Sequence, residues 1–381
     1  MVEPAPPSPQ AAADVVAQWA HTIRTTAAQG GRLAIRGGGS KAFYGEPLGG
    51  ELPVLDTRAL SGVVLYEPTE LVVRAFGGTP LAALENLLHA HGQCLPFEPP
   101  HFGPEATVGG MVAAGLAGPA RMAAGGVRDY VLGVRLLNGR GEDLYFGGEV
   151  MKNVAGYDVS RALAGSLGAL GVIVEVALKV LPRAAGECTL RLPLPLPEAL
   201  HRLACWRAQP RPLNANAWLP DDGGVLWLRL RGAQAAVDAA RQQLLAELPG
   251  GASADPDEAQ ALWQGLREHT HPWLATPPSP AHGLWRLVVP PTTPAWPSWP
   301  NTLVEWMGAQ RWVWAPLADG ADLRALAQQA GGHATLFRPP AQTPDAAPRF
   351  SAPEAALAAL QQRVRAAFDP QQVFAHRLRL A

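Results

Sequence analysis

The spacing of apolar residues in the first half of the chain predicts alternating helices and strands. Val16, Trp19 and Ile23 recur at three- and four-residue intervals, which predicts an amphipathic helix over 11–29. Thr79-Pro80 is a typical helix start, because threonine caps a helix and proline suits its first turn. The other elements expected here are strands at 32–36, 63–66, 71–76 and 171–181, a helix that ends at Gly92, a hairpin over 131–146 and a short helix at 158–164.

The apolar pattern changes after Pro182, where strand-like and helical segments are mixed. Nine prolines fall between Pro272 and Pro300. Because proline lacks an amide donor, we expect that stretch to be an irregular, rigid connection rather than a helix or a central strand. The mixture predicts an α+β arrangement. The elements expected are strands at 225–230, 284–289 and 312–314 and helices at 234–248, 258–269, 322–330 and 353–368.

The composition is that of a folded protein with two or three domains. The chain has 381 residues, of which 48% are hydrophobic and 17% charged, and its net charge is −1. Since no basic stripe is interleaved with aromatic residues, we expect no nucleic-acid partner. No apolar run reaches about 18 residues, and residues 1–10 lack the apolar core of a signal peptide. We therefore expect a cytoplasmic protein without a membrane span.

Cysteine is scarce, and its spacing limits the redox chemistry of this chain. Cys94, Cys188 and Cys205 form no C-x-x-C pair. This spacing excludes a disulfide framework, a cysteine zinc site and an iron–sulfur cluster within the chain. A one-electron carrier would therefore belong to another subunit.

Glycine is concentrated in the first half, where 29 of the 40 glycines fall within the first 186 residues. The sharpest run, Gly37 to Lys41, directly follows a predicted strand. It loosely matches a Rossmann fingerprint, but Gly45 and Pro47 interrupt the helix that such a fold requires. The residue order also differs from a Walker P-loop. A glycine nest that binds a pyrophosphate fits better, and a tight surface turn is the plain alternative.

Three further clusters carry candidate chemistry. Residues 99–110 combine three prolines, His101 and three glycines, which favours close approach to a planar group, although such a histidine is more often structural. Residues 151–158 are dense in polar groups and would otherwise be a capped helix entry. In the second half, His333 and Arg338 form the only site-like cluster, for which a buried structural histidine is the favoured alternative, and Trp312 joins them as a candidate by its position and polarity.

Together, these motifs resemble the FAD-binding subunits of bacterial glycolate oxidases, within the vanillyl-alcohol-oxidase/PCMH flavoprotein superfamily. The match is dense over residues 32–183 and sparser beyond. The segments that carry it are 35–43, 98–101, 106–113, 146–158 and 331–335.

The resemblance implies an α+β fold with a two-subdomain PCMH-type FAD-binding domain over 1–184, to which 353–381 returns, and an α+β cap domain over 185–352. It implies non-covalent FAD, because Ser40-Lys41 stand where covalent members carry a histidine. The cofactor-binding residues implied are Arg36, Gly37, Gly38, Gly39, Ser40 and Lys41 for the pyrophosphate, Pro100, Thr107, Gly109, Gly110, Ala113 and Gly115 for the flavin and ribityl chain, and Asp129, Val172 and Ile173 for the adenosine half.

The chain departs from the family pattern in two places. Catalytic relatives carry a metal motif, H-x-x-D-G-N-x-H, in the cap, whereas here His333 has neither an acid nor a second histidine beside it. We therefore expect no metal site, and His333 and Arg338 are only candidates for catalysis. The family also tends to end in Phe-Asn-Pro-Gly, whereas this chain has Phe374-Ala375-His376, so the polar contact of the asparagine is missing.

Two functions follow from the resemblance. The first is an FAD-dependent oxidoreductase subunit of a glycolate (2-hydroxy-acid) oxidase complex, which oxidises glycolate to glyoxylate and passes electrons to an iron–sulfur partner. The alternative is a non-catalytic electron-relay or assembly subunit, whose homologous FAD-binding partner carries the cap metal motif and oxidises the small 2-hydroxy acid. Either complex would be cytoplasmic or held at the inner membrane through its partners.

Overall fold

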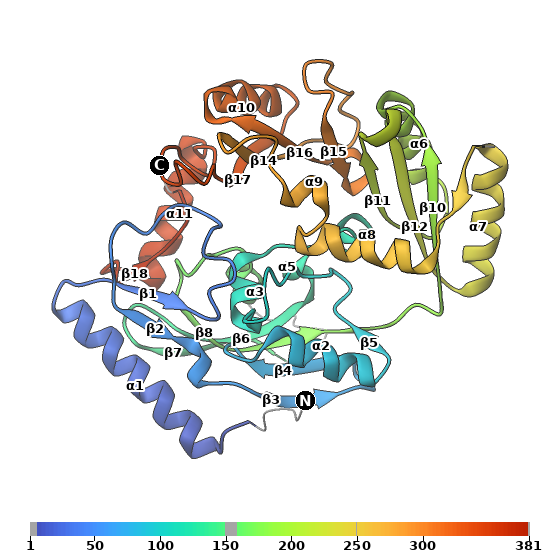
Figure 1. The fold of residues 1–381 in the computed structure, drawn as a ribbon. Helices are drawn as coiled ribbons and strands as arrows, with labels where there is room; N and C mark the ends of the chain where they lie inside the picture. The colour runs from blue at the N-terminus through green and yellow to red at the C-terminus, as the bar shows by residue number, and fades with distance from the viewer. Residues whose placement is uncertain (1–5, 149–157, 249, 380–381) are drawn as a thin grey trace. The chain divides into compact units, whose positions relative to one another are not determined.

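The computed structural model describes residues 6–148, 158–248 and 250–379, which divide into two compact units (Figure 1). Both units contain helices and sheets, which confirms the α+β class. The candidate residues 151–157 lie outside the described residues. Unit 1 consists of Met1–Leu116, Gly126–Pro182 and Ala352–Ala381, and unit 2 of Ala117–Gly125 and Arg183–Ser351.

The segment 117–125, which the sequence placed in the first domain, belongs to unit 2. It contains the one-turn helix α4 (Arg121–Ala124), which packs on β11 (Leu213–Leu219). The indole of Trp306 donates a hydrogen bond to the Gly118 carbonyl at 3.1 Å, and the Arg121 guanidinium lies 5.2 Å from the Trp306 ring centroid. These contacts are long-range in sequence, so local pattern could not reveal them.

A five-stranded antiparallel sheet forms the larger layer of unit 1. Its inner strand β8 has seven buried residues among eight, which explains its continuous apolar sequence. The strands run in the order β3 (Val63–Glu67), β4 (Val72–Phe76), β8 (Val172–Lys179), β6 (Val131–Leu137) and β7 (Asp143–Gly147).

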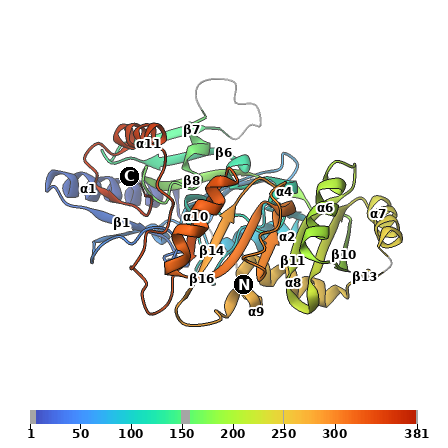
Figure 2. The ribbon, with the colours of Figure 1, turned by 90° about the horizontal axis from the view of Figure 1, so that it is seen from above.

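A smaller parallel sheet joins the two ends of the chain. In the order β18 (Phe374–Ala375), β1 (Leu33–Arg36), β2 (Val54–Asp56), it pairs Leu33 with Phe374. The apolar stripe of α1 (Pro9–Ala28) shares a buried cluster with these residues. The other elements of unit 1 are α2 (Leu81–Ala90), β5 (Gln93–Cys94), α3 (Val108–Ala114), α5 (Val127–Tyr130), β9 (Leu181–Pro182) and α11 (Ala355–Phe368), which lies beside β7 in Figure 2.

Unit 2 is built on an eight-stranded antiparallel sheet. Helices α6 (Leu196–Arg207) and α7 (Gln234–Glu247) share one apolar cluster with its strands, and α10 (Gly320–Gln329) shares another. The strands run in the order β13 (Ala252–Ser253), β10 (Gly186–Pro193), β12 (Val225–Gly232), β11, β15 (Thr302–Glu305), β16 (Gln310–Pro316), β14 (His282–Val288) and β17 (His333–Arg338), and the remaining helices are α8 (Pro256–Glu268) and α9 (Pro272–Ala275).

Two predictions from local pattern need correction. The Pro-rich stretch 272–300 is not wholly irregular, because it contains α9, which was not expected, beside the inner strand β14, which confirms the strand expected at 284–289. The helix expected at 158–164 is only a 3₁₀ turn, Ser160–Leu163, since Gly165 and Gly168 follow with φ of 84° and 82°. Within the described ranges, no helix is both long and apolar enough to span a membrane.

Asp369 fixes the returning end of the chain. Its side chain is fully buried, and its two carboxylate oxygens accept hydrogen bonds from the amides of Val373 (2.9 Å) and Phe374 (3.0 Å). The Arg365 guanidinium lies 4.0 Å away. These bonds turn the chain from α11 into β18.

We expect Asp369→Ala to lower the free energy of unfolding of unit 1 by about 1–3 kcal/mol, because it leaves two buried amides without acceptors. Urea denaturation followed by circular dichroism measures the change. Asp14→Ala, on the exposed face of α1, is the matched control. A D369A variant as stable as the wild type would contradict this role.

His376 should make the returning end sensitive to acid. Burial, with the nearby charges of Arg365 and Arg32, lowers its pKa to about 4. Because an unfolded histidine takes up its proton near pH 6.5, stability should fall as the pH drops from about 6.5 to about 4. His376→Gln should reduce that loss in denaturation experiments at about pH 7 and pH 5. His21→Gln, exposed on α1, should leave the loss unchanged.

Candidate cofactor-binding site

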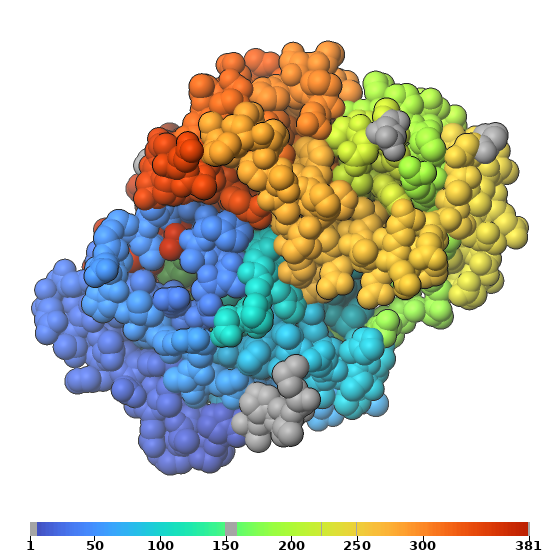
Figure 3. Space-filling model, viewed as in Figure 1, coloured from blue at the N-terminus to red at the C-terminus, as the bar shows by residue number. Residues whose placement is uncertain are grey.

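Unit 1 contains a hollow with a cavity volume of about 420 Å³. Its walls come from five stretches of chain, the first and last of which are more than 300 residues apart. Figure 3 shows the opening among the blue N-terminal residues, with red atoms of the C-terminal segment near its floor. The lining residues fall within 34–42, 48–57, 107–114, 167–173 and 375–377.

The loop that follows β1 is shaped by contacts that only glycine allows. A Cβ atom at Gly38 would lie 1.4 Å from the Glu105 carbonyl oxygen, and one at Gly37 would lie 2.3 Å from Thr107 Oγ1. Gly39 has φ of +73°, in the left-handed region. The loop therefore lies directly against the second glycine-rich segment.

The second segment begins α3 and closes onto the sheet. Thr107 caps α3 by accepting a hydrogen bond from the Gly110 amide at 3.2 Å. The Gly109 amide donates to the Gly77 carbonyl at 2.7 Å, and a Cβ there would lie 2.9 Å from that oxygen. The second segment thus packs closely against the sheet through its glycine backbone.

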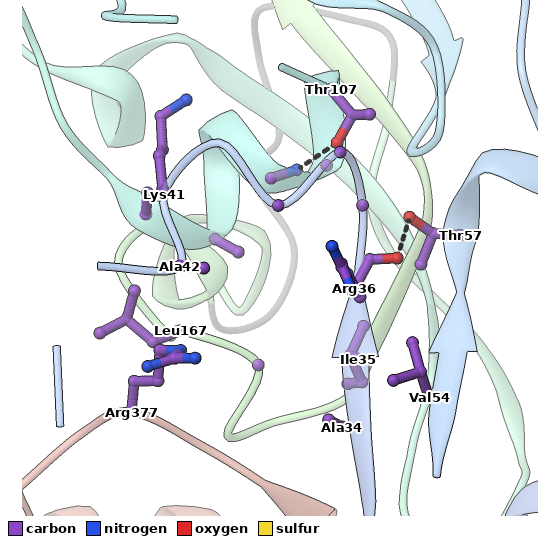
Figure 4. Close-up of a pocket in the computed structure, with 18 of the residues that line it drawn as sticks. Ala34, Ile35, Arg36, Lys41, Ala42, Val54, Thr57, Thr107, Leu167 and Arg377 are labelled. Carbon is purple, nitrogen blue, oxygen red and sulfur yellow. Dashed lines mark hydrogen bonds between the residues drawn. The ribbon is translucent and has the colours of Figure 1, made fainter. Parts of the chain in front are cut away.

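The charges at the hollow are all positive. Arg36, Lys41 and Arg377 line it, and no acidic side chain does so among the described residues. The Lys41 ammonium donates to the His101 carbonyl at 3.1 Å and to Ser40 Oγ at 3.4 Å. Figure 4 shows Arg36 and Arg377 on different sides of the drawn pocket. This electrostatic balance favours an anionic ligand.

Most cofactor-binding residues predicted from the sequence lie together in this hollow. They come from the loop after β1, from α3 and its cap, and from β8. The predicted residues that line it are Arg36, Gly37, Gly38, Gly39, Ser40, Lys41, Thr107, Gly109, Gly110, Ala113 and Ile173.

Four predicted residues do not line the hollow. Pro100 is buried outside it, and Gly115 ends α3 with φ of +64°. Asp129 accepts a hydrogen bond from the Gly126 amide at 2.8 Å and so caps α5. Val172 points into the apolar core, since successive residues of a strand face opposite sides and Ile173 takes the pocket side.

Sequence reasoning missed several lining residues. Gly168 and Gly171 have positive φ, and their place in a glycine-rich turn was an available signal. A Cβ at Gly168 would meet only Ile35, at 3.7 Å, so this glycine leaves room inside the pocket. Val54 and Arg377 carried no local signal, because the pairing of β1 with β2 and β18 brings them there.

Two of the catalytic candidates in the second half, Trp312 and Arg338, make hydrogen bonds within unit 2. Trp312 is 2% exposed, donates from Nε1 to Glu305 at 2.6 Å and packs edge-on against His269. Burial, with the charges of Arg338 and Arg286, lowers the pKa of His269 well below its ordinary value. Arg338 donates to the Leu274 carbonyl at 3.0 Å.

His333 stands apart from these groups. It is exposed at the start of β17, at the opposite end of that strand from Arg338. In the described ranges, no three histidine, cysteine or acidic side chains gather as potential metal ligands.

The donor set of the hollow fits a long ligand with an anionic centre. Backbone loops and guanidinium groups suit a diphosphate, and Ile35, Val54 and Ile173 supply apolar walls for a planar ring. This is the chemistry of a dinucleotide.

Comparisons with known proteins agree with this chemistry. Residues 9–145 match a family model described as an FAD binding domain. An alkyldihydroxyacetonephosphate synthase structure shares the fold, with a TM-score of 0.63 at 15% identity over 94% of this chain and 75% of that one. The expected cofactor is confirmed as FAD.

Two curated relatives are subunits of glycolate oxidase. GlcD of Bacillus subtilis is 36% identical over 22% of this chain and 18% of its own length. GlcE of Escherichia coli is 46% identical over 305 residues, which cover 80% of this chain and 82% of the relative. The resemblance stated from the sequence is confirmed, and the chain belongs to the FAD-binding oxidoreductase family of glycolate oxidase subunit GlcE.

Proposed function

We propose that the unit 1 hollow is the FAD site and that the cofactor is bound non-covalently. The observation that carries this proposal is the pairing of two glycine-rich loops at a pocket whose charged lining residues are all basic. In this proposal the diphosphate lies on the loop 36–41, and the ribityl chain and flavin follow 107–113.

The residues of the pocket would bind and orient the cofactor. FAD, when bound, supplies a two-electron acceptor for the oxidation of an alcohol carbon. Arg36 would balance the diphosphate charge, and loop amides would donate to its oxygens. Ile35 and Ile173 would exclude water from the ring that they contact.

We further propose that this chain is the FAD-binding subunit of a complex that oxidises glycolate, a small 2-hydroxy acid, to glyoxylate. The similarity to two glycolate oxidase subunits supports this activity. Because only three cysteines occur and none forms a C-x-x-C pair, an iron–sulfur partner would receive the electrons. In this proposal the complex is cytoplasmic, or held at the inner membrane through its partners.

A second candidate is an electron-relay or assembly subunit, whose homologous FAD-binding partner oxidises the substrate. The internal hydrogen bonds of the candidate side chains in unit 2 favour this second function. Trp312 and Arg338 both hold internal hydrogen bonds there, and His333 stands at the other end of β17 from Arg338. Trp312 and Arg338 are therefore already engaged in contacts within unit 2.

Gly38→Ala tests the placement of FAD. Because its Cβ would overlap the Glu105 carbonyl, the loop must move, and we expect FAD affinity to fall at least about tenfold. Equilibrium release of FAD, followed by flavin fluorescence, measures this. Gly250→Ala adds a methyl group in open space and should leave affinity unchanged. Full FAD affinity in folded G38A would refute the placement.

Anaerobic addition of glycolate separates the two candidates. If this subunit oxidises substrate, the flavin absorbance of the isolated chain should bleach rapidly. If it relays electrons, bleaching should require the homologous FAD-binding partner. Absorbance at the flavin band, recorded with and without the co-purified subunits, gives the answer. D-lactate and glycerol serve as a related acid and a non-acid control.

A further inference from the structure

We propose that the exposed face of α11 is the docking surface for the iron–sulfur subunit that receives the electrons. The inference rests on the proposed function of this chain as a subunit of an oxidising complex. The surface consists of Leu357, Leu360 and Val364, which we call the α11 stripe. These residues are 49%, 53% and 37% exposed, and they make up half of the exposed large hydrophobic side chains in the described part of the chain.

Helix α11 packs only lightly on unit 1. Of its 14 residues only Ala358 is buried, and ten are exposed. The helix is attached at its C-terminal end, where Phe368 packs against Phe146 with ring centroids 5.9 Å apart and the Phe368 carbonyl accepts a hydrogen bond from the Gly139 amide at 2.9 Å. Because helices of this length depend mostly on tertiary packing for their stability, we expect the α11 stripe to be covered in the working complex.

The spacing of the α11 stripe suits a second helix. Leu357, Leu360 and Val364 are three and four residues apart, and Ala367 continues the same spacing. This spacing places them along one side of the helix, in the pattern that packs into the holes of a facing helix. The partner surface is therefore expected to be an apolar helix face.

The charges beside the stripe favour an acidic partner. Helix α11 contains two arginines and no acidic residue. The Arg365 guanidinium lies 4.0 Å from Asp369, whereas Arg363 is exposed at the edge of the stripe, three residues after Leu360. A helix whose apolar face is flanked by aspartate or glutamate would complement both the stripe and Arg363.

Two other occupants fit less well. A second copy would supply Glu354, which precedes the helix and lies on the opposite edge of the stripe from Arg363. Antiparallel two-fold pairing sets like edges together, and parallel pairing leaves the two residues about 13 Å apart along the axis. A lipid surface usually requires a cluster of basic residues, whereas one exposed arginine borders this stripe.

The position and size of the stripe favour an electron acceptor. Helix α11 leads through Asp369 into β18, and Ala375 of β18 lines the proposed FAD hollow (Figure 1). A partner on α11 would therefore bind the unit that holds the flavin. The helix is about 21 Å long, so its face is smaller than the roughly 800 Å² per partner that a stable dimer buries. Small interfaces are typical of electron-transfer partners.

The test is the affinity of the full-length, FAD-loaded chain for the purified iron–sulfur subunit, measured by calorimetry at two salt concentrations. We expect Leu360→Glu to weaken binding at least about tenfold, because it places an unpaired charge in an apolar contact. Arg363→Glu should weaken binding about tenfold and make it stronger at high salt than at low salt, since like charges then face each other. Gln362→Glu, exposed on the other side of the helix, adds the same charge and should bind as the wild type does.

The outcomes separate this inference from the proposed function. Weaker binding in both variants, with FAD release as in the wild type, supports the docking surface. Wild-type affinity in folded L360E overturns it and leaves the proposed complex in place, whereas a wild-type chain that does not bind the iron–sulfur subunit overturns both. If L360E instead loses the homologous FAD-binding subunit, a second copy or anionic vesicles, the occupant is wrong and the inference falls. If circular dichroism shows that L360E is unfolded, R363E decides: wild-type affinity and salt dependence overturn the proposal.

Discussion

Gly37 and Gly38 lie so close to Thr107 and to the Glu105 carbonyl that no side chain fits between the two loops. This exclusion is the constraint on which the pocket depends. It brings the end of β1 against the start of α3, although some seventy residues separate them in sequence. Because the two loops are in contact, residues of both line the same hollow. Larger residues at Gly37 or Gly38 would push the two loops apart.

The sequence predicted the parts of this site that are local. The loop 36–41 and the segment 107–113 each carry glycines at short spacing next to an apolar strand or helix, so pattern alone located them. Val172 and Ile173 were both assigned to the site, but period-2 alternation lets only one of two neighbouring strand residues face the pocket, and that residue is Ile173. Arg377 was missed because its position depends on a parallel pairing between the two ends of the chain.

Unit 2 shows a different kind of constraint. Trp306 and Met307 both have positive φ, near 54° and 55°, a conformation that costs roughly 1–2 kcal/mol per residue outside glycine. Asn216 Oδ1 stabilises this turn by accepting a hydrogen bond from the Met307 amide at 2.6 Å, and the Trp306 indole donates a hydrogen bond to the Gly118 carbonyl. The strained turn at Trp306 and Met307 contacts the segment 117–125, which belongs to unit 2. In the sequence, this segment closely follows α3, the glycine-rich helix that lines the pocket of unit 1.

The pairing of β1 with β18 also has a consequence for biosynthesis. A chain emerging from the ribosome presents β1 early, but its parallel partner is made some 340 residues later, since Leu33 pairs with Phe374. Parallel pairing between such distant segments is slow to form, and domains usually fold as they emerge. The second unit can therefore fold while the first is still incomplete. Cofactor loading must then wait until β18 has been made, and a chain cut short before β18 would lack the pocket wall formed by Ala375 and Arg377.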